Sequence, residues 1–178
     1  MLTRWAIAAA SVFVLLGPGA PTSWRVVDAV ATDEGLCDAN RKPANLSIAL
    51  KDINNENVRL ADYKGKVIAI NFWATSCAPC RFEIPAFVDL QARYGAQGLQ
   101  VIGISVGDTR DLLEPYVARF RMNYPVLQGL DREDVKGAFG PIFAIPETVI
   151  VSRAGNVCRK HRGVVPAHVV EREIKSLL

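Results

Sequence analysis

The sequence has little of several residue types, and each shortage excludes a class of protein. Its 178 residues include only 4 cysteines, too few for a small domain held together mainly by disulfides. The 21 basic and 18 acidic side chains leave a net charge of only +3. No stretch gathers the positive charge that binding a nucleic-acid backbone requires, so we expect no nucleic-acid partner. Half of the residues are apolar (50%), and no repeat or low-complexity linker divides the chain, so we expect one domain.

Residues 1–36 differ from the rest and are predicted to form an export segment followed by a linker. Arg4 precedes the apolar run 5–16, and the chain carries no further charge before Arg25. The run suits a signal peptide better than a membrane-spanning helix, which needs about 20 apolar residues. The sequence leaves open a removed signal, an uncleaved membrane anchor and, as a third reading, a buried helix of a cytosolic protein. Either export reading places residues 37–178 in the periplasm or on the outer face of the cytoplasmic membrane, where disulfides persist.

Strand-like and helix-like segments alternate over residues 37–178, which is typical of an α/β domain. Two short strands around Asn54–Glu56 predict an N-terminal β-hairpin. Residues 66–73 and 99–106 are almost entirely apolar, as in strands that are buried on both faces. The helix expected after the first of these strands has apolar residues at helical spacing, namely Phe82, Phe87, Leu90 and Tyr94. The later segments predict helices over 110–121, 131–139 and 166–178, an extended piece over 125–127, and a hairpin of 147–151 with 156–162.

Cys77 and Cys80 follow the first apolar strand and open the predicted helix. Unpaired N–H groups and the dipole at the start of a helix lower the pKa of the first cysteine and stabilise its thiolate. The intervening Ala78–Pro79 supplies no cation, so we expect a potential toward the reducing end of the dithiol scale. A zinc site would need a second C-x-x-C or closely spaced histidines, whereas His161 and His168 are dispersed and expected at the surface. The pattern therefore predicts a redox dithiol without a metal or cofactor.

Three segments between Leu46 and Leu178 carry a family resemblance: Gly65–Val67, Asn71–Pro85 around the dithiol, and Ile145–Thr148. They resemble the thioredoxin superfamily and, within it, the membrane-anchored or periplasmic TlpA/ResA/DsbE-type (CcmG-like) thiol-disulfide oxidoreductases of bacteria. The resemblance implies a thioredoxin-like fold, in which helices flank a central mixed β-sheet, with the N-terminal β-hairpin as an extension. It also implies that Cys77 attacks the client and that Cys80 resolves the mixed disulfide.

The same resemblance implies which residues surround the dithiol. Pro146 is implied to be cis and to face the cysteines, and client binding is assigned to Trp73, Ser76, Ile145, Pro146 and Glu147. Ser76 stands where the family usually has Trp, which removes part of the apolar wall beside the dithiol. Glu147 has two readings, contact with client peptides or exposure to solvent.

Thioredoxin has a buried Asp at the position of Asn71, and an Asn side chain cannot titrate. Glu83 lies one helical turn after Cys80 and is the expected replacement as proton acceptor. If it is buried, its pKa should be raised; the alternative is a solvated carboxylate on the helix surface. The resemblance to TlpA, in which an additional cysteine pair occurs, implies a structural disulfide between Cys37 and Cys158, with two unpaired cysteines as the alternative.

These features predict an exported disulfide reductase. The Pro-Glu-Thr triplet and His161–Gly163 resemble the DsbE branch, which serves cytochrome c maturation, whereas the additional cysteines resemble TlpA, whose clients include copper-delivery proteins of respiratory oxidase. The expected partners are thus an apocytochrome c or a copper chaperone, and a membrane electron donor of the DsbD or CcdA type. The alternatives are a dithiol oxidase or isomerase, a copper-binding chaperone and a thiol peroxidase. A peroxidase needs P-x-x-x-T-x-x-C, which is absent at both cysteines, and a copper chaperone of the Sco kind needs C-x-x-x-C.

Overall fold

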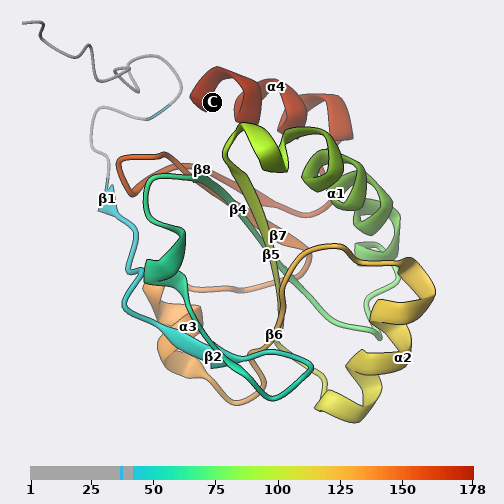
Figure 1. Ribbon diagram of the computed structural model, residues 1–178. Coiled ribbons are helices and arrows are strands. Elements are labelled where there is room, and N and C mark those ends of the chain that lie inside the picture. The colour runs from blue at the N-terminus through green and yellow to red at the C-terminus, as the bar shows by residue number, and fades with distance from the viewer. Residues whose placement is uncertain (1–36, 38–41) are drawn as a thin grey trace, which may run out of the picture. The chain divides into compact units, whose positions relative to one another are not determined.

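The computed structural model describes Cys37 and residues 42–178, so the predicted export segment 1–36 lies outside the described residues. The predicted α/β architecture is confirmed: a six-stranded sheet has the order β1-β8-β7-β4-β5-β6, and a separate hairpin pairs β2 with β3 (Figure 1). The strands are β1 Lys42–Pro43, β2 Ala49–Lys51, β3 Asn57–Arg59, β4 Val67–Trp73, β5 Leu99–Ser105, β6 Val126–Gln128, β7 Glu147–Val151 and β8 Asn156–Arg162. The helices are α1 Cys80–Tyr94, α2 Arg110–Phe120, α3 Glu133–Ala138 and α4 Ala167–Leu177, with short 3-10 turns η1 Leu60–Tyr63 and η2 Gly95–Gln97.

Strands β4 and β5 form the centre of the sheet, as their continuous apolar sequences predict. Every residue of both strands is buried. They run parallel to each other, while β7 pairs with β4 in the antiparallel direction, which makes the sheet mixed. Because β4 and β5 are parallel, the loops that follow them leave the same edge of the sheet. This edge carries the cysteine pair.

Helices α1, α2 and α4 cover one face of the sheet. Their apolar side chains pack on the same core cluster as alternate residues of β4, including Val67, Ala69 and Trp73. Figure 1 shows α1 and α4 on the same side of the sheet, and Arg93 of α1 forms an ion pair of 2.8 Å with Glu171 of α4. Phe82 differs from the sequence-based expectation: it fits the helical spacing, but its side chain is 80% exposed.

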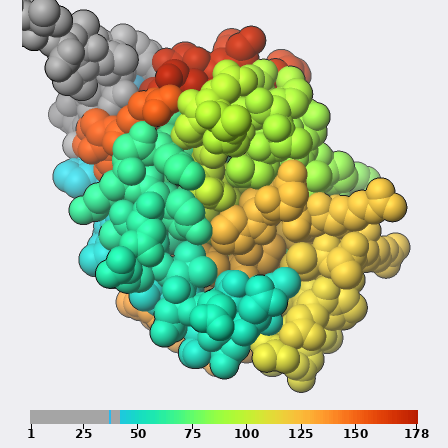
Figure 2. Space-filling view, in the orientation of Figure 1, coloured from blue at the N-terminus to red at the C-terminus, as the bar shows by residue number. Residues whose placement is uncertain are grey.

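The opposite face of the sheet is covered by α3 and by the β2–β3 hairpin. Buried residues of the hairpin segment, such as Leu50 and Leu60, pack on the alternate residues of β4 and β5. The hairpin is held at the β6 end of the sheet, where Gln128 Nε2 donates to the Asp52 carbonyl at 2.6 Å. Arg132 also donates to the carbonyl of Ala49, at 3.2 Å. Figure 2 shows the blue-green hairpin segment in contact with the yellow and orange segments that include these partners.

The N-terminal end of the described segment lies at the β8 edge of the sheet. Lys42 and Pro43 of β1 pair with Val157 and Asn156 of β8 in the antiparallel direction. Over the residues that the structure describes, none of the helices has the length and apolarity needed to cross a lipid bilayer.

Candidate active site

The cysteine pair lies between the end of β4 and the start of α1. Cys77 belongs to the turn after Trp73, and Cys80 is the first residue of α1. The two residues form a disulfide with a Cα–Cα distance of 5.4 Å, and the Cys80 N–H donates to Cys77 Sγ at 3.2 Å. Cys80 has 0% exposed surface, whereas Cys77 is partly exposed. An incoming sulfur therefore reaches Cys77 and not Cys80.

Glu83 lies on the first turn of α1, one turn beyond Cys80, and is only 5% exposed. Its Oε1 accepts the N–H of Val165 at 2.9 Å, while Oε2 is buried without a hydrogen-bond partner among the described residues. Burial raises the pKa of Glu83, although the Val165 N–H, the nearby Asn71 amide and, to a smaller extent, His161 act in the opposite direction. This side chain is not a solvated surface carboxylate. A raised pKa makes this carboxylate a better proton acceptor, which suits proton exchange with the neighbouring thiol.

The loop before β7 brings a cis proline to the end of β4. The Ile145–Pro146 peptide bond is cis, the isomer that the family resemblance implies. Because Phe72 pairs with Glu147, Pro146 lies beside the last residue of β4, where the cysteine turn begins. Pro146 is buried and Ile145 is partly exposed, and both Ile145 and Cys77 pack against the same core cluster. Of these two loop residues, Ile145 leaves more apolar surface near the dithiol.

Glu147 differs from both sequence-based readings. Its side chain has 0% exposure, so it neither points to solvent nor offers a surface to a client. Lys160 Nζ lies 2.8 Å from Oε1, and Arg162 Nε lies 3.6 Å from Oε2. Lys160 also donates to the Phe139 carbonyl at 3.0 Å. Glu147 therefore joins the start of β7 to β8 by ion pairs, and Lys160 extends this link to the end of α3.

Trp73 also differs from its expected role in client binding, because its side chain is fully buried. Its ring packs on Tyr116 of α2 at a centroid distance of 5.3 Å. A side chain at Gly103 would lie within 3.1 Å of Trp73 Nε1, so the absence of a Cβ there makes room for the indole. Trp73 thus packs in the core at the end of β4, where the cysteine turn begins. Ser76, in contrast, is exposed beside Cys77.

Asp108 anchors the cysteine turn and was not found from the sequence. The residue follows β5 and is only 3% exposed. Its Oδ2 accepts the Thr75 N–H at 2.8 Å and the Ser105 hydroxyl at 2.6 Å, and Oδ1 accepts the Thr75 hydroxyl in a short hydrogen bond. The sequence could have indicated it only through the topology, because the loops that follow two adjacent parallel strands lie at the same edge of the sheet.

His161 is a second residue whose place the sequence did not reveal. It was expected at the surface without a role, but its Nε2 lies 2.7 Å from Glu173 Oε2, and both side chains are largely covered. His161 pairs with Thr148 across β8 and β7, and Thr148 pairs with Asn71 across β7 and β4. Asn71 Nδ2 donates to Thr148 Oγ1 at 3.2 Å. A polar row therefore crosses the sheet on the face where Glu83 lies.

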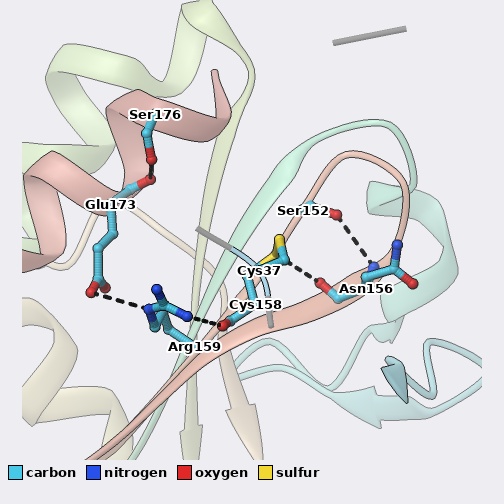
Figure 3. Close-up of a disulfide and its surroundings, with 7 residues drawn as sticks. All are labelled: Cys37, Ser152, Asn156, Cys158, Arg159, Glu173 and Ser176. Carbon is cyan, nitrogen blue, oxygen red and sulfur yellow. Dashed lines mark hydrogen bonds and ion pairs between the residues drawn. A yellow bond between two sulfur atoms is a disulfide. The ribbon is translucent and has the colours of Figure 1, made fainter. Parts of the chain in front are cut away.

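Cys37 and Cys158 form a second disulfide, with a sequence separation of 121 residues. Figure 3 shows it at β8, where Cys158 Sγ lies 3.5 Å from the carbonyl oxygen of Asn156. Cys158 is 3% exposed. Its neighbour Arg159 lies 3.9 Å from Glu173 of α4. This disulfide links the N-terminal segment to the strand that carries Lys160 and His161, away from the dithiol turn.

The arrangement around Cys77 and Cys80 is suited to thiol-disulfide exchange. It provides one accessible sulfur, one buried sulfur and a buried carboxyl group that can exchange a proton. Among the described residues, no group of three or more His, Cys, Asp or Glu side chains is placed to hold a metal ion.

Comparisons with known proteins agree with this chemistry. Residues 42–160 match the AhpC/TSA family. The chain is 31% identical over 129 residues to the thiol-disulfide oxidoreductase ResA of Geobacillus kaustophilus, covering 72% of each protein. Among solved structures, a thioredoxin-family thiol:disulfide interchange protein from Chlorobium tepidum is 29% identical with a TM-score of 0.71, covering 79% of this chain and 99% of that one. A putative thiol:disulfide interchange protein DsbE from the same organism shares the fold at 24% identity, with a TM-score of 0.66, covering 76% of this chain and 98% of that one.

The dithiol geometry and the relatives lead to one assignment. The sequence has the redox C-x-x-C and lacks the P-x-x-x-T-x-x-C arrangement at both Cys77 and Cys80. The fold and the cis proline next to the cysteine turn are those that the thioredoxin-like resemblance implies. The chain belongs to the AhpC/TSA family and is a thioredoxin-like thiol-disulfide oxidoreductase similar to ResA and DsbE.

Proposed function

We propose that this oxidoreductase acts outside the cytoplasm as a disulfide reductase, in cytochrome c maturation or in the assembly of a copper-containing respiratory oxidase. The observation that carries the proposal is the unequal environment of the two cysteines: Cys77 is partly exposed, while Cys80 is buried one helical turn from the buried Glu83. This arrangement supports one attacking and one resolving sulfur. The choice of client rests on the resemblance of the sequence to DsbE and TlpA.

In the proposed reaction, the Cys77 thiolate attacks one sulfur of a client disulfide. The client S–S bond breaks, a mixed disulfide forms, and the released client thiolate takes a proton from water. The Cys80 thiol then passes its proton to Glu83, and the resulting thiolate attacks Cys77 Sγ. The second client sulfur leaves in reduced form, and the Cys77–Cys80 disulfide closes after the transfer of two electrons. A membrane electron donor of the DsbD or CcdA type restores the dithiol.

The reducing direction is supported by the surroundings of Cys77. In the oxidised form its sulfur accepts one backbone N–H, that of Cys80, and the intervening residues Ala78 and Pro79 carry no charge. A strongly oxidising dithiol needs an unusually stable thiolate, which these groups do not supply. The extracytoplasmic location rests on the predicted export segment. We propose the division into this segment, residues 1–36, and a thioredoxin-like domain, residues 37–178.

The reduction potential of the Cys77–Cys80 pair tests the direction. We expect a value near that of thioredoxin, about −270 mV, when the protein is equilibrated with dithiothreitol buffers. A value near that of DsbA, about −120 mV, would overturn the reductase assignment in favour of a dithiol oxidase. The variant lacking Cys37 and Cys158 provides the control, because it reports the active-site pair alone.

Trapping tests the assignment of the two sulfurs. Cys80→Ser should accumulate a mixed disulfide with an oxidised C-x-x-C-H peptide, the sequence to which c-type haem is attached. Cys77→Ser should give little adduct, because the remaining sulfur is buried. Preferential alkylation of Cys80 in the reduced protein at mildly acidic pH would contradict the assignment.

A further inference from the structure

Three exposed apolar side chains belong to the segments that carry the dithiol, the cis proline and the end of β8. Phe82 follows Cys80 on α1 and is 80% exposed, Phe143 precedes the cis proline and is 74% exposed, and Val164 follows β8 and is 52% exposed. Large apolar side chains at such exposure cost solubility and commonly mark binding surfaces when they gather in one place. Contacts of neighbouring residues connect the segments that carry these three side chains.

The segment after β8 connects the other two parts of the site. The Gly163 N–H donates to the Pro146 carbonyl at 2.8 Å. Two residues later, the Val165 N–H donates to Glu83 at 2.9 Å. Val164 therefore lies between the cis-proline loop and the first turn of α1. Phe143 is joined to the same segment, because the Arg162 guanidinium lies over its ring at 5.4 Å.

The charges exposed among these side chains are positive. Arg81, beside Cys80, is exposed and forms no ion pair with any described residue. The Arg162 side chain is 59% exposed. The two acidic residues beside the cysteine turn, Glu83 and Asp108, are buried, and so is Glu147 at the start of β7. Glu147 lies near both Lys160 and Arg162, so one negative charge faces two positive charges.

We propose that Phe82, Phe143, Val164, Arg81 and Arg162 form a docking rim for client segments that carry acidic and apolar side chains next to the reactive cysteine. The proposal rests on the proposed reductase function and names its substrate class. Exposed aromatic and arginine side chains are the residue types that contribute most to protein interfaces. Net positive charge at the rim favours the approach of acidic segments and opposes basic ones.

Two synthetic peptides test the rim. Each has one internal disulfide and the same apolar residues, and they differ only in carrying two Glu or two Lys beside the attacked cysteine. Reduced protein, freed of reductant, is mixed with each peptide, and the second-order rate constant of a single turnover is measured at low and at high salt. We expect the Glu peptide to react about tenfold faster at low salt, with the ratio falling as salt is added.

Arg81→Gln and Arg162→Gln should each lower this ratio several-fold. Lys64→Gln is the matched control, because Lys64 is exposed just before β4, at the opposite end of the strand from the dithiol, about 20 Å away. It removes the same charge and should leave the ratio unchanged. Phe143→Ala should slow both peptides about threefold without altering their ratio, whereas Phe143→Leu should retain most of the rate. Because Arg81 and Phe143 are exposed, the melting temperatures of their variants should change little. Arg162→Gln removes one of the two cations near the buried Glu147, so its melting temperature is measured alongside the rate.

The possible outcomes distinguish failure of the docking-rim proposal from failure of the proposed reductase function. Reduction of both peptides at equal rates, or a ratio that neither arginine variant changes, refutes the docking rim and leaves the function intact. Failure to reduce either peptide contradicts the proposed function itself. A dimer that sedimentation detects and Phe143→Ala dissociates identifies the rim as a contact between copies of this chain, which also overturns the proposal.

Discussion

Asp108 should hold the cysteine turn in place, and the size of its contribution follows from its three hydrogen bonds. Its carboxyl group accepts both the N–H and the hydroxyl of Thr75, together with the hydroxyl of Ser105. Asp108→Ala leaves three donors without this acceptor, and we expect a loss of about 3 to 6 kcal/mol in the free energy of unfolding. Asp108→Asn can keep its amide oxygen at the position of Oδ2, where two of the bonds are made. We therefore expect it to lose only about 1 to 2 kcal/mol.

Urea unfolding of the oxidised protein measures these differences, and the reactivity of Cys77 measures their consequence. Thr75 lies two residues before Cys77, so loosening its hydrogen bonds should change the alkylation rate of Cys77 in the reduced protein. Leu60→Ala is the control: it removes a fully buried side chain from the opposite face of the sheet at a cost of about 2 to 5 kcal/mol. It should not change the alkylation rate. The reasoning fails if Asp108→Ala costs less than about 1 kcal/mol, or if Leu60→Ala and Asp108→Asn alter alkylation alike.

Three further variants test the other buried groups. Because the folded-state pKa of Glu83 is raised above its ordinary value of 4.5, its contribution to stability is present at lower pH and is lost as the pH rises through the folded pKa. Glu83→Gln should thus become more stable relative to the wild type from acidic to neutral pH in urea titrations, while slowing resolution of the mixed disulfide; parallel curves would contradict this. Replacing Cys37 and Cys158 by Ser should lower the free energy of unfolding by about 2 to 5 kcal/mol, and this bond should survive mild reductant that opens the active-site pair, as peptide mapping would show. Lys160→Met leaves the buried Glu147 with Arg162 alone and should cost about 2 to 4 kcal/mol by urea unfolding.

The sequence predicted the elements whose signals are local. The strands 147–151 and 156–162 match β7 and β8 residue for residue, because a β-branched run precedes a turn in which Gly155 has a positive φ of 84°. Periodicity was less informative about the face of a helix. Phe82 fits the spacing of α1 but lies on the side turned away from the core, because the helix already buries Ile84 and Phe87 against the sheet.

The supporting residues of the site depend on contacts between distant segments, which a single sequence does not display. Asp108 resembles an ordinary loop acid until β4 and β5 are known to end side by side. The row of Asn71, Thr148 and His161 appears only when the register of three strands is fixed, since these residues are far apart in the chain. The C-x-x-C motif was recognisable because its chemistry is confined to four consecutive residues.

Two buried glutamates lie near the end of β4 on opposite faces of the sheet, and their different partners suit them to different tasks. Glu147 is close to Lys160 and Arg162, and these ion pairs tie the start of β7 to β8. Glu83 has the N–H of Val165 for one oxygen and no hydrogen-bond partner among the described residues for the other, and burial raises its pKa. This setting supports the proposed exchange of a proton between Glu83 and the neighbouring sulfur. Glu147 instead holds β7, the strand that follows the cis proline, against β8 through its two ion pairs.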